Sequence, residues 1–413
     1  MTEQFDTQGG HLDTLFYGKP TKNGETTIQK STTAWEVFWY IAMHVAHVMF
    51  PDTEARHRYV SDTPCFSALE ADDRQQLLSF LQAVAELRQF APTLLRFRLP
   101  HGFVAHVVEL QSALTFARRP SGDRGDIRTT VEETDGWMDV GECCASHILP
   151  VLFAQLYLDM RRVQAFDERF ERTDWGLCLM DVTAGMREPC VMDLKLGCYR
   201  VSHMTRQAKV HRVEKKDSGK LVRQVGLRFT WMRRFAHVET VKNGVPRRVS
   251  KKETVDKKFG YHIHTAAQLA EVMRAFFSTN DEALLHDIVR RGSSEEDVSP
   301  RVGGSTHHVA GEQSLQRARR RAAGERISKL IHFFEKTGEG LFLLQDMAFV
   351  SSNVLFVYDA AEEDLKSLRN ASIVYFIDFA HSCPRHLNFE EEKLGFVKGL
   401  KNTYALLFNE PLV

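Results

Sequence analysis

The chain has 413 residues, 43% hydrophobic and 26% charged, and its 54 basic residues equal its 54 acidic ones. It can bury a large core, and a net charge of zero gives no sign of a nucleic-acid-binding protein. Seven cysteines without a Cys-x-x-Cys pair indicate neither a zinc site nor a disulfide framework. The start lacks a signal-peptide pattern, and the apolar run 34–50 contains Glu36 and two histidines, so we expect no membrane span and a reducing compartment, the cytoplasm or the nucleus.

Two β-prone runs open the chain, 12–17 and 26–30, and the Asn-Gly pair between them predicts a hairpin. A helix apolar nearly all round follows to residue 50, which predicts that it is buried. Kinases hold ATP phosphates with a lysine on a strand, paired with a glutamate on a buried helix. Lys30 and Glu36 fit that pattern; a surface lysine and a glutamate that only caps the helix are the alternative.

The middle of the chain predicts helices at 67–90 and 149–170. Between them, the polar stretch 118–147, rich in Gly, Asp and Arg, predicts a loop insertion. The stretch 291–325 is poor in apolar residues and predicts a disordered insertion running into a basic helix start. Its arginine cluster, 317–321, fits a nuclear-localisation patch or a solvated helix face equally well.

The most informative stretch is Pro189–Gly197, an apolar run with Asp193 and Lys195 one position apart. On a strand, these two side chains point to the same face. Both ions are costly to bury unless charged groups meet them, so a polyanion is the natural occupant, with Lys195 on its phosphates and Asp193 on a hydroxyl or a metal. Gly197 lets the backbone turn or a ligand approach closely. A structural Asp–Lys pair on an ordinary strand is the alternative.

The charge balance shifts after this stretch. From Arg206 to Lys258, 17 basic residues stand against 5 acidic ones. Such a local excess attracts a multiply charged anion. A solvated basic loop is the alternative, and it is favoured for the part 242–258.

Two late runs carry the remaining candidates. Residues 350–359 begin Val-Ser-Ser-Asn and read as a strand, and the β-prone run 373–377 delivers Asp378 at its end. Magnesium prefers one or two carboxylates together with phosphate oxygens, so Asp378 is well placed to bind it. A turn or a helix cap is the alternative for this aspartate.

Several of these segments resemble one known family. Pro189–Gly197 matches P-x-x-x-D-x-K-x-G at every fixed position, and 377–381 reads Ile-Asp-Phe-Ala-His. Both resemble the signature segments of the inositol polyphosphate kinase family. Supporting likenesses are 8–11, Gln-Gly-Gly-His, with one residue missing before the glycines, and the hinge-like 179–183. The resemblance runs in matching order from the start to the last helix.

The resemblance implies an α+β, two-lobed kinase-like fold with an antiparallel sheet in each lobe and ATP bound between the lobes. Residues 1–182 would form the N-terminal lobe, with the hinge at 179–183, and residues 183–413 would form the C-terminal lobe. The segment 198–225 would bind the inositol phosphate. The residues directly after the signature, Gly197-Cys198-Tyr199-Arg200, do not show the Glu-Lys pair that many members carry, which leaves the choice of substrate open.

The resemblance also implies roles for single residues. Asp193 would accept the proton of the inositol hydroxyl, and Lys195 would hold the substrate and neutralise charge during transfer. Asp378 would bind Mg²⁺. Contacts to ATP are implied for Lys30, for Asp181 and Val182 at the hinge, and for Ser352, and further contacts to the substrate for Arg206, Lys209 and Arg212.

Two residue assignments stay open. Lys19 competes with Lys30 as the ATP lysine, although the spacing from Lys30 to Glu36 suits the family better. Asp181 at a strand end also fits a plain turn residue.

The implied activity is transfer of the γ-phosphate of ATP to an inositol tris- or tetrakisphosphate, as in a multikinase. One alternative is a kinase that forms pyrophosphates on inositol hexakisphosphate. Another is a catalytically silent scaffold that binds inositol phosphates. Phosphoinositide headgroups are a further candidate substrate, and a monomer is expected.

Overall fold

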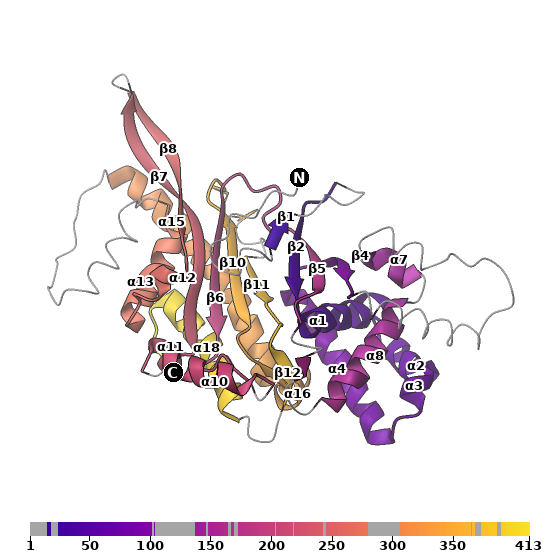
Figure 1. Cartoon of the computed structure of the whole chain (residues 1–413). Coiled ribbons are helices and arrows are strands. Elements are labelled where there is room, and N and C mark those ends of the chain that lie inside the picture. The colour runs from indigo at the N-terminus through magenta and orange to yellow at the C-terminus, as the bar shows by residue number, and fades with distance from the viewer. Residues whose placement is uncertain are drawn as a thin grey trace.

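The chain folds into two lobes of mixed helix and sheet, seen in a computed structural model (Figure 1). None of the described helices is both long enough and apolar enough to cross a membrane. Residues 8–11 and Lys19 lie outside the described part of the chain. The described residues are 15–17, 24–100, 103, 137–145, 148–163, 167–168, 172–202, 204–217, 219–242, 245–279, 306–364, 366–367, 373–385 and 390–413.

The N-terminal lobe contains a five-stranded antiparallel sheet in the order β1-β2-β5-β3-β4. The predicted hairpin is present, because β1 pairs with β2. The strands are β1 (Leu15–Tyr17), β2 (Thr27–Thr32), β3 (Leu94–Arg98), β4 (Trp137–Asp139) and β5 (Trp175–Met180). The helices are α1 (Ala34–His44), the π-helical turn η2 (Val45–Met49), α2 (Thr53–Asp62), α3 (Pro64–Ser67), α4 (Ala71–Leu87), the 3₁₀ turn η3 (Arg88–Phe90), α7 (Val140–Ala145) and α8 (Ile148–Arg162).

Helix α1 forms the centre of this lobe. Its residues from Ala34 to Met43 are all buried, as the apolar pattern predicts. Phe38 stacks on Phe80 of α4 at 5.7 Å and on Phe153 of α8 at 5.8 Å between ring centroids. The strand that carries Lys30 therefore leads into a helix that is fixed from several sides.

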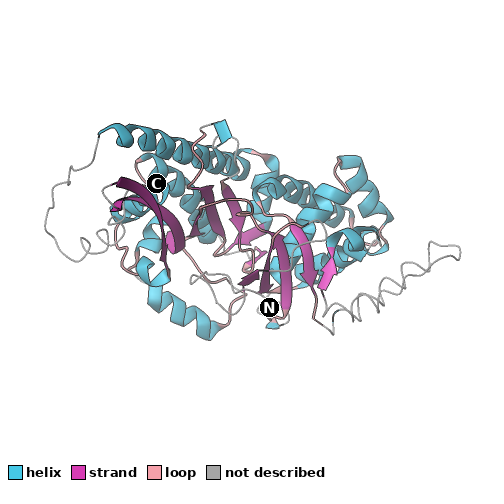
Figure 2. Cartoon of the chain, turned by 90° about the horizontal axis from the view of Figure 1, so that it is seen from above, coloured by secondary structure: helices cyan, strands magenta, loops and turns pink. Residues whose placement is uncertain are grey.

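The C-terminal lobe has a second five-stranded antiparallel sheet, in the order β11-β10-β6-β7-β8. Seen from above, the two sheets follow one another across the molecule, with long helices along one side (Figure 2). The strands are β6 (Pro189–Leu196), β7 (Leu227–Lys242), β8 (Val245–Val255), β10 (Asn353–Asp359) and β11 (Val374–Ile377), with a separate pair β9 (Met347–Phe349) and β12 (Ser382–Pro384). The helices are α10 (Gln207–Asp217), α11 (Leu221–Val225), α12 (Lys257–Gly260), α13 (Ala266–Phe277), α15 (Thr306–Lys336), α16 (Gly338–Asp346) and α18 (Glu390–Phe408).

The fold confirms an α+β class with an antiparallel sheet in each lobe. The strand β6, which carries Asp193 and Lys195, lies at the centre of its sheet between β10 and β7. This position is favourable for a functional strand, since both neighbours fix it by backbone hydrogen bonds.

The expectations for the two insertions need correction. The predicted loop 118–147 contains β4 and α7 at its end, from Trp137 to Ala145. The predicted disorder over 291–325 is wrong from Thr306 onward, because α15 begins there. Arg319 in the basic cluster is only 1% exposed, pairs with Glu312 at 3.2 Å, and lies over the ring of Tyr358. From composition alone, such an arginine is expected on the solvated surface. Here it lies inside the lobe, where an acidic partner compensates its charge.

Candidate active site

The carboxylate of Asp378 lies between two lysines that come from different lobes. Lys195 on β6 donates to Asp378 Oδ2 at 2.7 Å, and Lys30 on β2 donates to Oδ1 at 3.1 Å. Lys30 also pairs with Glu36 of α1, at 2.8 Å from Oε2. Lys30, Lys195 and Asp378 thus meet at one point, although they are far apart in the sequence. The sequence analysis assigned them to ATP, substrate and metal, respectively.

The segment that carries Asp378 is fixed by α1. The ring of Phe379 packs against Trp39 at 5.6 Å and against Tyr40 at 5.7 Å between centroids. Thr33 donates a hydrogen bond to the carbonyl of Ala380 at 3.1 Å. Helix α1 therefore positions both Glu36 and the metal-binding candidate, and it couples the two lobes at the site.

Mutual attraction keeps this cluster ionised. Burial disfavours a charge on Asp378, but Lys195 and Lys30 outweigh it and hold its pKa well below the usual range. Burial likewise opposes the charge of Lys30, but Asp378 and Glu36 together raise the pKa of that ammonium above its ordinary value. At neutral pH the site is an alternating row of cations and anions, in which an incoming polyanion can replace Asp378 as the partner of either lysine.

Asp193 has the opposite electrostatic character. Burial raises the pKa of its carboxyl to about 6, although the charge of Lys195 lowers it and that of Asp378 raises it further. Its Oδ1 is buried and has no hydrogen-bond partner within the described chain. A carboxylate with a pKa near neutral and a vacant acceptor oxygen is suited to take up a proton.

The sheet register adds two residues that sequence reasoning did not assign to the site. Lys195 on β6 stands opposite Asn353 of β10 on one side and Arg228 of β7 on the other. Asn353 is 4% exposed, and its Oδ1 accepts a hydrogen bond from Lys195 at 3.0 Å. It also hydrogen-bonds Asp193, which favours the ionised carboxylate. Asn353 thus orients both signature residues at once.

Arg228 adds a third cation to the same row. Burial and the nearby charge of Arg200 lower the pKa of its guanidinium to about 10, although it stays protonated at neutral pH. No hydrogen bond from its side chain is made within the described residues. The signal for Asn353 and Arg228 is the strand pairing itself, which a single sequence does not contain.

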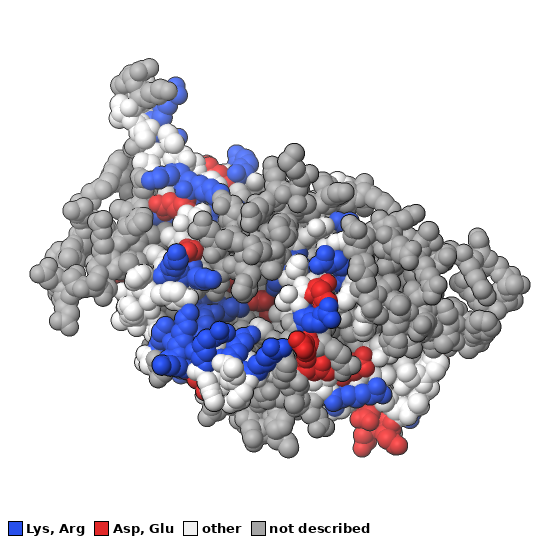
Figure 3. Space-filling model, in the orientation of Figure 1, with Lys and Arg blue, Asp and Glu red and all other residues white. Residues whose placement is uncertain are grey.

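The basic segment after β6 forms α10 and α11, and Lys and Arg side chains gather over these helices (Figure 3). Burial, together with the charge of Lys209, lowers the pKa of His381 to about 4, so Lys209 lies close to the end of the metal-binding candidate segment. Arg212 is exposed one turn further along α10. Arg206 is exposed as well, but it pairs with Glu168 at 3.1 Å.

A buried ion pair anchors this helix. Two guanidinium nitrogens of Arg200, Nε and Nη2, each donate to one carboxylate oxygen of Asp217, which is 3% exposed. A bidentate arginine–carboxylate pair is geometrically specific. The loop after β6 and the last turn of α10 are therefore joined, which keeps Lys209 and Arg212 in a fixed relation to the signature strand.

An apolar patch lies on the same face of β6 as the two charged signature residues. It consists of Val191, Trp231 and Val357, with Val182 and three further partly buried hydrophobic side chains packed against it. Val191, two positions before Asp193, shares its face by strand alternation. The patch is thus continuous with the charged row and reaches the turn between the lobes.

The two hinge candidates differ in what they do. The Asp181 carboxylate accepts hydrogen bonds from the backbone N–H of Thr183 at 2.8 Å and from its hydroxyl at 2.7 Å, so it closes the turn after β5. The side chain of Asp181 therefore acts as a turn residue, which was the alternative predicted for it. The backbone N–H of Val182 donates to no group within the described chain, and the side chain lies on the apolar patch.

The structure does not bring the side chain of Ser352 to the surface of the site. It is fully buried, and its hydroxyl lies 3.2 Å from that of Ser382. Its carbonyl accepts from the N–H of Leu196 at 2.8 Å. Ser352 therefore ties β6 to the segment after Asp378 and acts on the site only through their positions.

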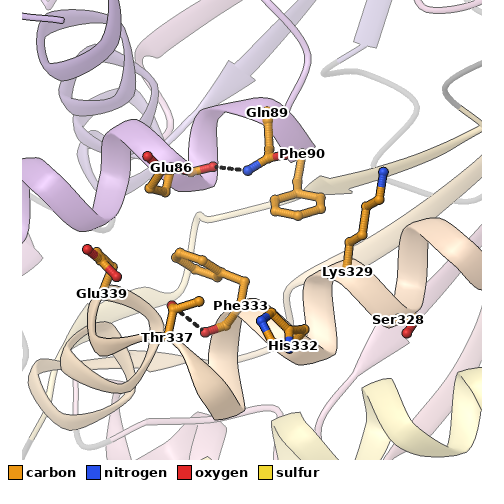
Figure 4. A pocket seen from close by; sticks show the side chains of 9 residues that line it. All are labelled: Glu86, Gln89, Phe90, Ser328, Lys329, His332, Phe333, Thr337 and Glu339. Carbon is orange, nitrogen blue, oxygen red and sulfur yellow. Dashed lines mark hydrogen bonds between the residues drawn. The ribbon is translucent and has the colours of Figure 1, made fainter. Parts of the chain in front are cut away.

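A hollow lies between α4 and α15 and contains none of the predicted site residues. Its volume is about 470 Å³, and the rings of Phe90 and Phe333, with centroids 6.3 Å apart, form part of its wall (Figure 4). Its charged groups have both signs, Glu86 and Glu339 against Lys329. It therefore offers no chemistry that selects a particular ligand, and the charged row on β6 remains the candidate active site.

This fold and this charged row define a kinase-like protein, with a lysine–glutamate pair in one lobe and the carboxylate of Asp378 in the other. The family described as inositol polyphosphate kinase matches residues 176–297 and 305–407. The chain belongs to the inositol polyphosphate kinase family, and its class is that of an inositol phosphate kinase.

Comparison with other proteins adds distant structural likenesses. A solved structure of inositol phosphate multikinase Ipk2 from S. cerevisiae, in complex with ADP and Mn²⁺, is 14% identical, with a TM-score of 0.39 over 57% of this chain and 83% of that one. A structure from a study of the engineering of inositol phosphate multikinase is 18% identical, with a TM-score of 0.34 over 56% of this chain and 84% of that one. No curated protein matches the chain.

Proposed function

We propose that the chain transfers the γ-phosphate of ATP to a hydroxyl of an inositol tris- or tetrakisphosphate. The observation that carries the proposal is the pairing of Asp378 with Lys30 and Lys195, one lysine from each lobe. A polyphosphate bound between the lobes would be the natural partner of both ammonium groups. Phosphoryl transfer asks a protein mainly for such positioning and for neutralisation of charge.

The nucleotide fits along the face of β6. Its base would pack on the partly buried members of the apolar patch, among them Val182 and Leu355, and the backbone N–H of Val182 would donate to a ring nitrogen. The phosphates would then reach Lys30, whose pairing with Glu36 holds the ammonium in place. This position of ATP follows from the continuity of the apolar patch with the charged row. It leaves the side of the site next to α10 for the inositol phosphate that accepts the phosphoryl group.

The residues of the site fit Mg²⁺. Asp378 presents a carboxylate that is 22% exposed, and no group of three or more His, Cys, Asp or Glu that could form a protein cage for a metal is found among the described residues. Mg²⁺ is usually held by one or two carboxylates and completed by phosphate oxygens and waters. Bound there by Asp378, the ion would neutralise charge on the transferred phosphoryl group.

Asp193 and Lys195 would serve the transfer itself. The attacking inositol hydroxyl loses its proton to the Asp193 carboxylate while its oxygen forms a bond to the γ-phosphorus and the bond to the β-γ bridging oxygen breaks. The bridging oxygen leaves on ADP. Lys195 would neutralise the phosphoryl oxygens, which its hydrogen bonds to Asn353 and to the carbonyl of Ser351 position it to do.

The acceptor would lie against α10. Lys209 and Arg212 on that helix, together with Lys195 and Arg228, supply a small set of cations near the acceptor side. A set of this size suits an inositol with three or four phosphates better than a fully phosphorylated one. Arg206, which pairs with Glu168, would have to leave that partner to take part.

Binding of ATP should depend on Mg²⁺. In calorimetric titrations of the full chain we expect ATP to bind at least ~10-fold more tightly with Mg²⁺ than with a chelator, because Asp378 loses its lysine partners to the phosphates and needs another cation. Lys30→Ala should weaken ATP binding by a similar factor, and the exposed control Arg58→Ala should not change it. Equal affinity with and without Mg²⁺ would favour a scaffold that does not catalyse transfer.

A further inference from the structure

The β7–β8 ribbon projects from the C-terminal lobe (Figure 1). Strand β6 accompanies β7 only as far as Arg233, whereas β7 and β8 stay paired to Lys242 and Val245. Beyond Arg233, β7 pairs only with β8 in the described sheet. From Thr240 on, every side chain of the ribbon that is described up to Lys252 is exposed.

The ribbon combines positive charge with exposed apolar side chains. Residues 240–252 include five basic residues and no acidic one. Within the same stretch Val241 is 74% exposed, Val245 57% and Val249 46%. Blue side chains are visible on the projecting end of the ribbon (Figure 3). Exposed valines gathered at a projecting end indicate a surface that meets something less polar than water.

The two faces of the ribbon differ. Val245, Arg247 and Val249 alternate along β8 and so share one face, where Val249 stands opposite Val238 and Arg247 opposite Thr240. The other face satisfies its charges internally. There, Arg248 contacts Glu363 at 3.5 Å, and His237 contacts Glu188 at 2.7 Å. One face is therefore both cationic and apolar.

Protection of an exposed sheet edge explains only part of this pattern. Basic side chains and a proline on an edge strand discourage pairing with another chain, and β8 carries both. The valines serve no such purpose, since they would promote association. A nucleic acid would attract the cations but would leave the valines in water. An anionic lipid surface accommodates both, because cations meet the lipid phosphates while apolar side chains enter the headgroup boundary.

We propose that the end of the β7–β8 ribbon docks on anionic membrane surfaces. Val245 and Val249 would enter the headgroup boundary, and Arg247, which shares their face, would contact lipid phosphates. The contact would be peripheral and reversible, because the surface is small and its electrostatic part is screened by salt. The proposal does not depend on the kinase activity proposed above.

Sedimentation of the full chain with lipid vesicles tests the proposal. We expect binding to vesicles of phosphatidylcholine mixed with phosphatidylserine, and little binding to phosphatidylcholine alone. Arg247→Gln should weaken this binding about fivefold, and the double variant Val245→Ser/Val249→Ser, on the same face, should weaken it at least as much. Arg58→Gln, an exposed arginine of the other lobe, is the matched control and should bind like the wild type.

Three results would overturn the proposal. The first is absence of binding to the anionic vesicles, and the second is unchanged binding by both ribbon variants. The third is a loss of binding to a DNA duplex in Arg247→Gln with vesicle binding intact, which would assign the ribbon to nucleic acid. Melting curves establish that each variant is folded. Phosphate transfer to a soluble inositol phosphate should be unchanged in the valine variant. A failure of the docking proposal can therefore be distinguished from a failure of the kinase proposal.

Discussion

Asp378→Asn should lower turnover at least ~100-fold, which is the scale of losing one charge-stabilising contact. The substitution keeps the shape of the side chain but removes the negative charge that would bind Mg²⁺. It also adds no backbone strain, because Asp378 has φ +65° and Asn adopts this left-handed region as readily as Asp does. Steady-state kinetics with ATP and an inositol phosphate give the measurement.

The same substitution should destabilise the chain. Because Lys195 and Lys30 depress the pKa of Asp378, its stabilising contribution is present above the pKa of the unfolded chain and is lost as the pH falls through the folded value. At neutral pH we expect Asn at this position to cost about 2–4 kcal/mol, since two partly buried lysines lose a partner. Glu54→Gln, in a surface pair 81% exposed on the glutamate side, should change neither quantity. Turnover like that of the wild type in Asp378→Asn would remove Asp378 from the mechanism.

Asp193→Asn should lower turnover to a similar degree, at least ~100-fold, but should stabilise the chain. Burial raises the pKa of this carboxyl to about 6, so its ionised form costs the folded state free energy. By linkage, the cost is full above about pH 6 and vanishes below about pH 4, where the carboxyl is protonated in both states. The neutral amide avoids it, which should raise stability by about 1–3 kcal/mol at neutral pH.

Thermal melts of the two variants at about pH 8 and about pH 5 provide a paired comparison. Asp378→Asn should melt below the wild type and Asp193→Asn above it, with the gain from Asp193→Asn shrinking at the lower pH. Turnover of the wild type should fall as the pH drops through about 6, because the carboxylate flanked by Lys195, Lys30, Asp378 and Asn353 becomes protonated. A destabilised Asp193→Asn, or one with normal turnover, would mean that this carboxylate is structural.

Strand alternation and motif order predicted the centre of the site. The spacing of Asp193 and Lys195 placed both on one face of a strand, and Asp378 was expected at the end of another. The structure brings Lys195 and Asp378 into contact and adds Lys30 from the other lobe. The strand placements needed only local periodicity, whereas the meeting of these residues at one site was implied by the resemblance to the kinase family. The apolar pattern of α1 was likewise enough to predict its burial.

Non-local pairing set the limit of prediction. Asn353 and Arg228 join the site because β10 and β7 flank β6, and that order of strands is not encoded in any local pattern. Ser352 looked like a ligand contact but lies behind the site, where its hydroxyl meets Ser382. Composition misjudged α15, because the burial of Arg319 depends on Glu312 and on the ring of Tyr358. In each case the partner that decides the role is distant in the sequence or can be identified only from the packed fold.

The most direct test of the proposed activity is transfer of labelled phosphate from ATP to a panel of inositol phosphates, from tris- to hexakisphosphate, with and without Mg²⁺. We expect Mg²⁺-dependent product from the tris- or tetrakisphosphate and none from Asp378→Asn. Product from the hexakisphosphate alone would replace the proposed acceptor with a pyrophosphate-forming reaction. No product from any acceptor, with inositol phosphates still bound, would contradict the kinase assignment and leave a binding protein.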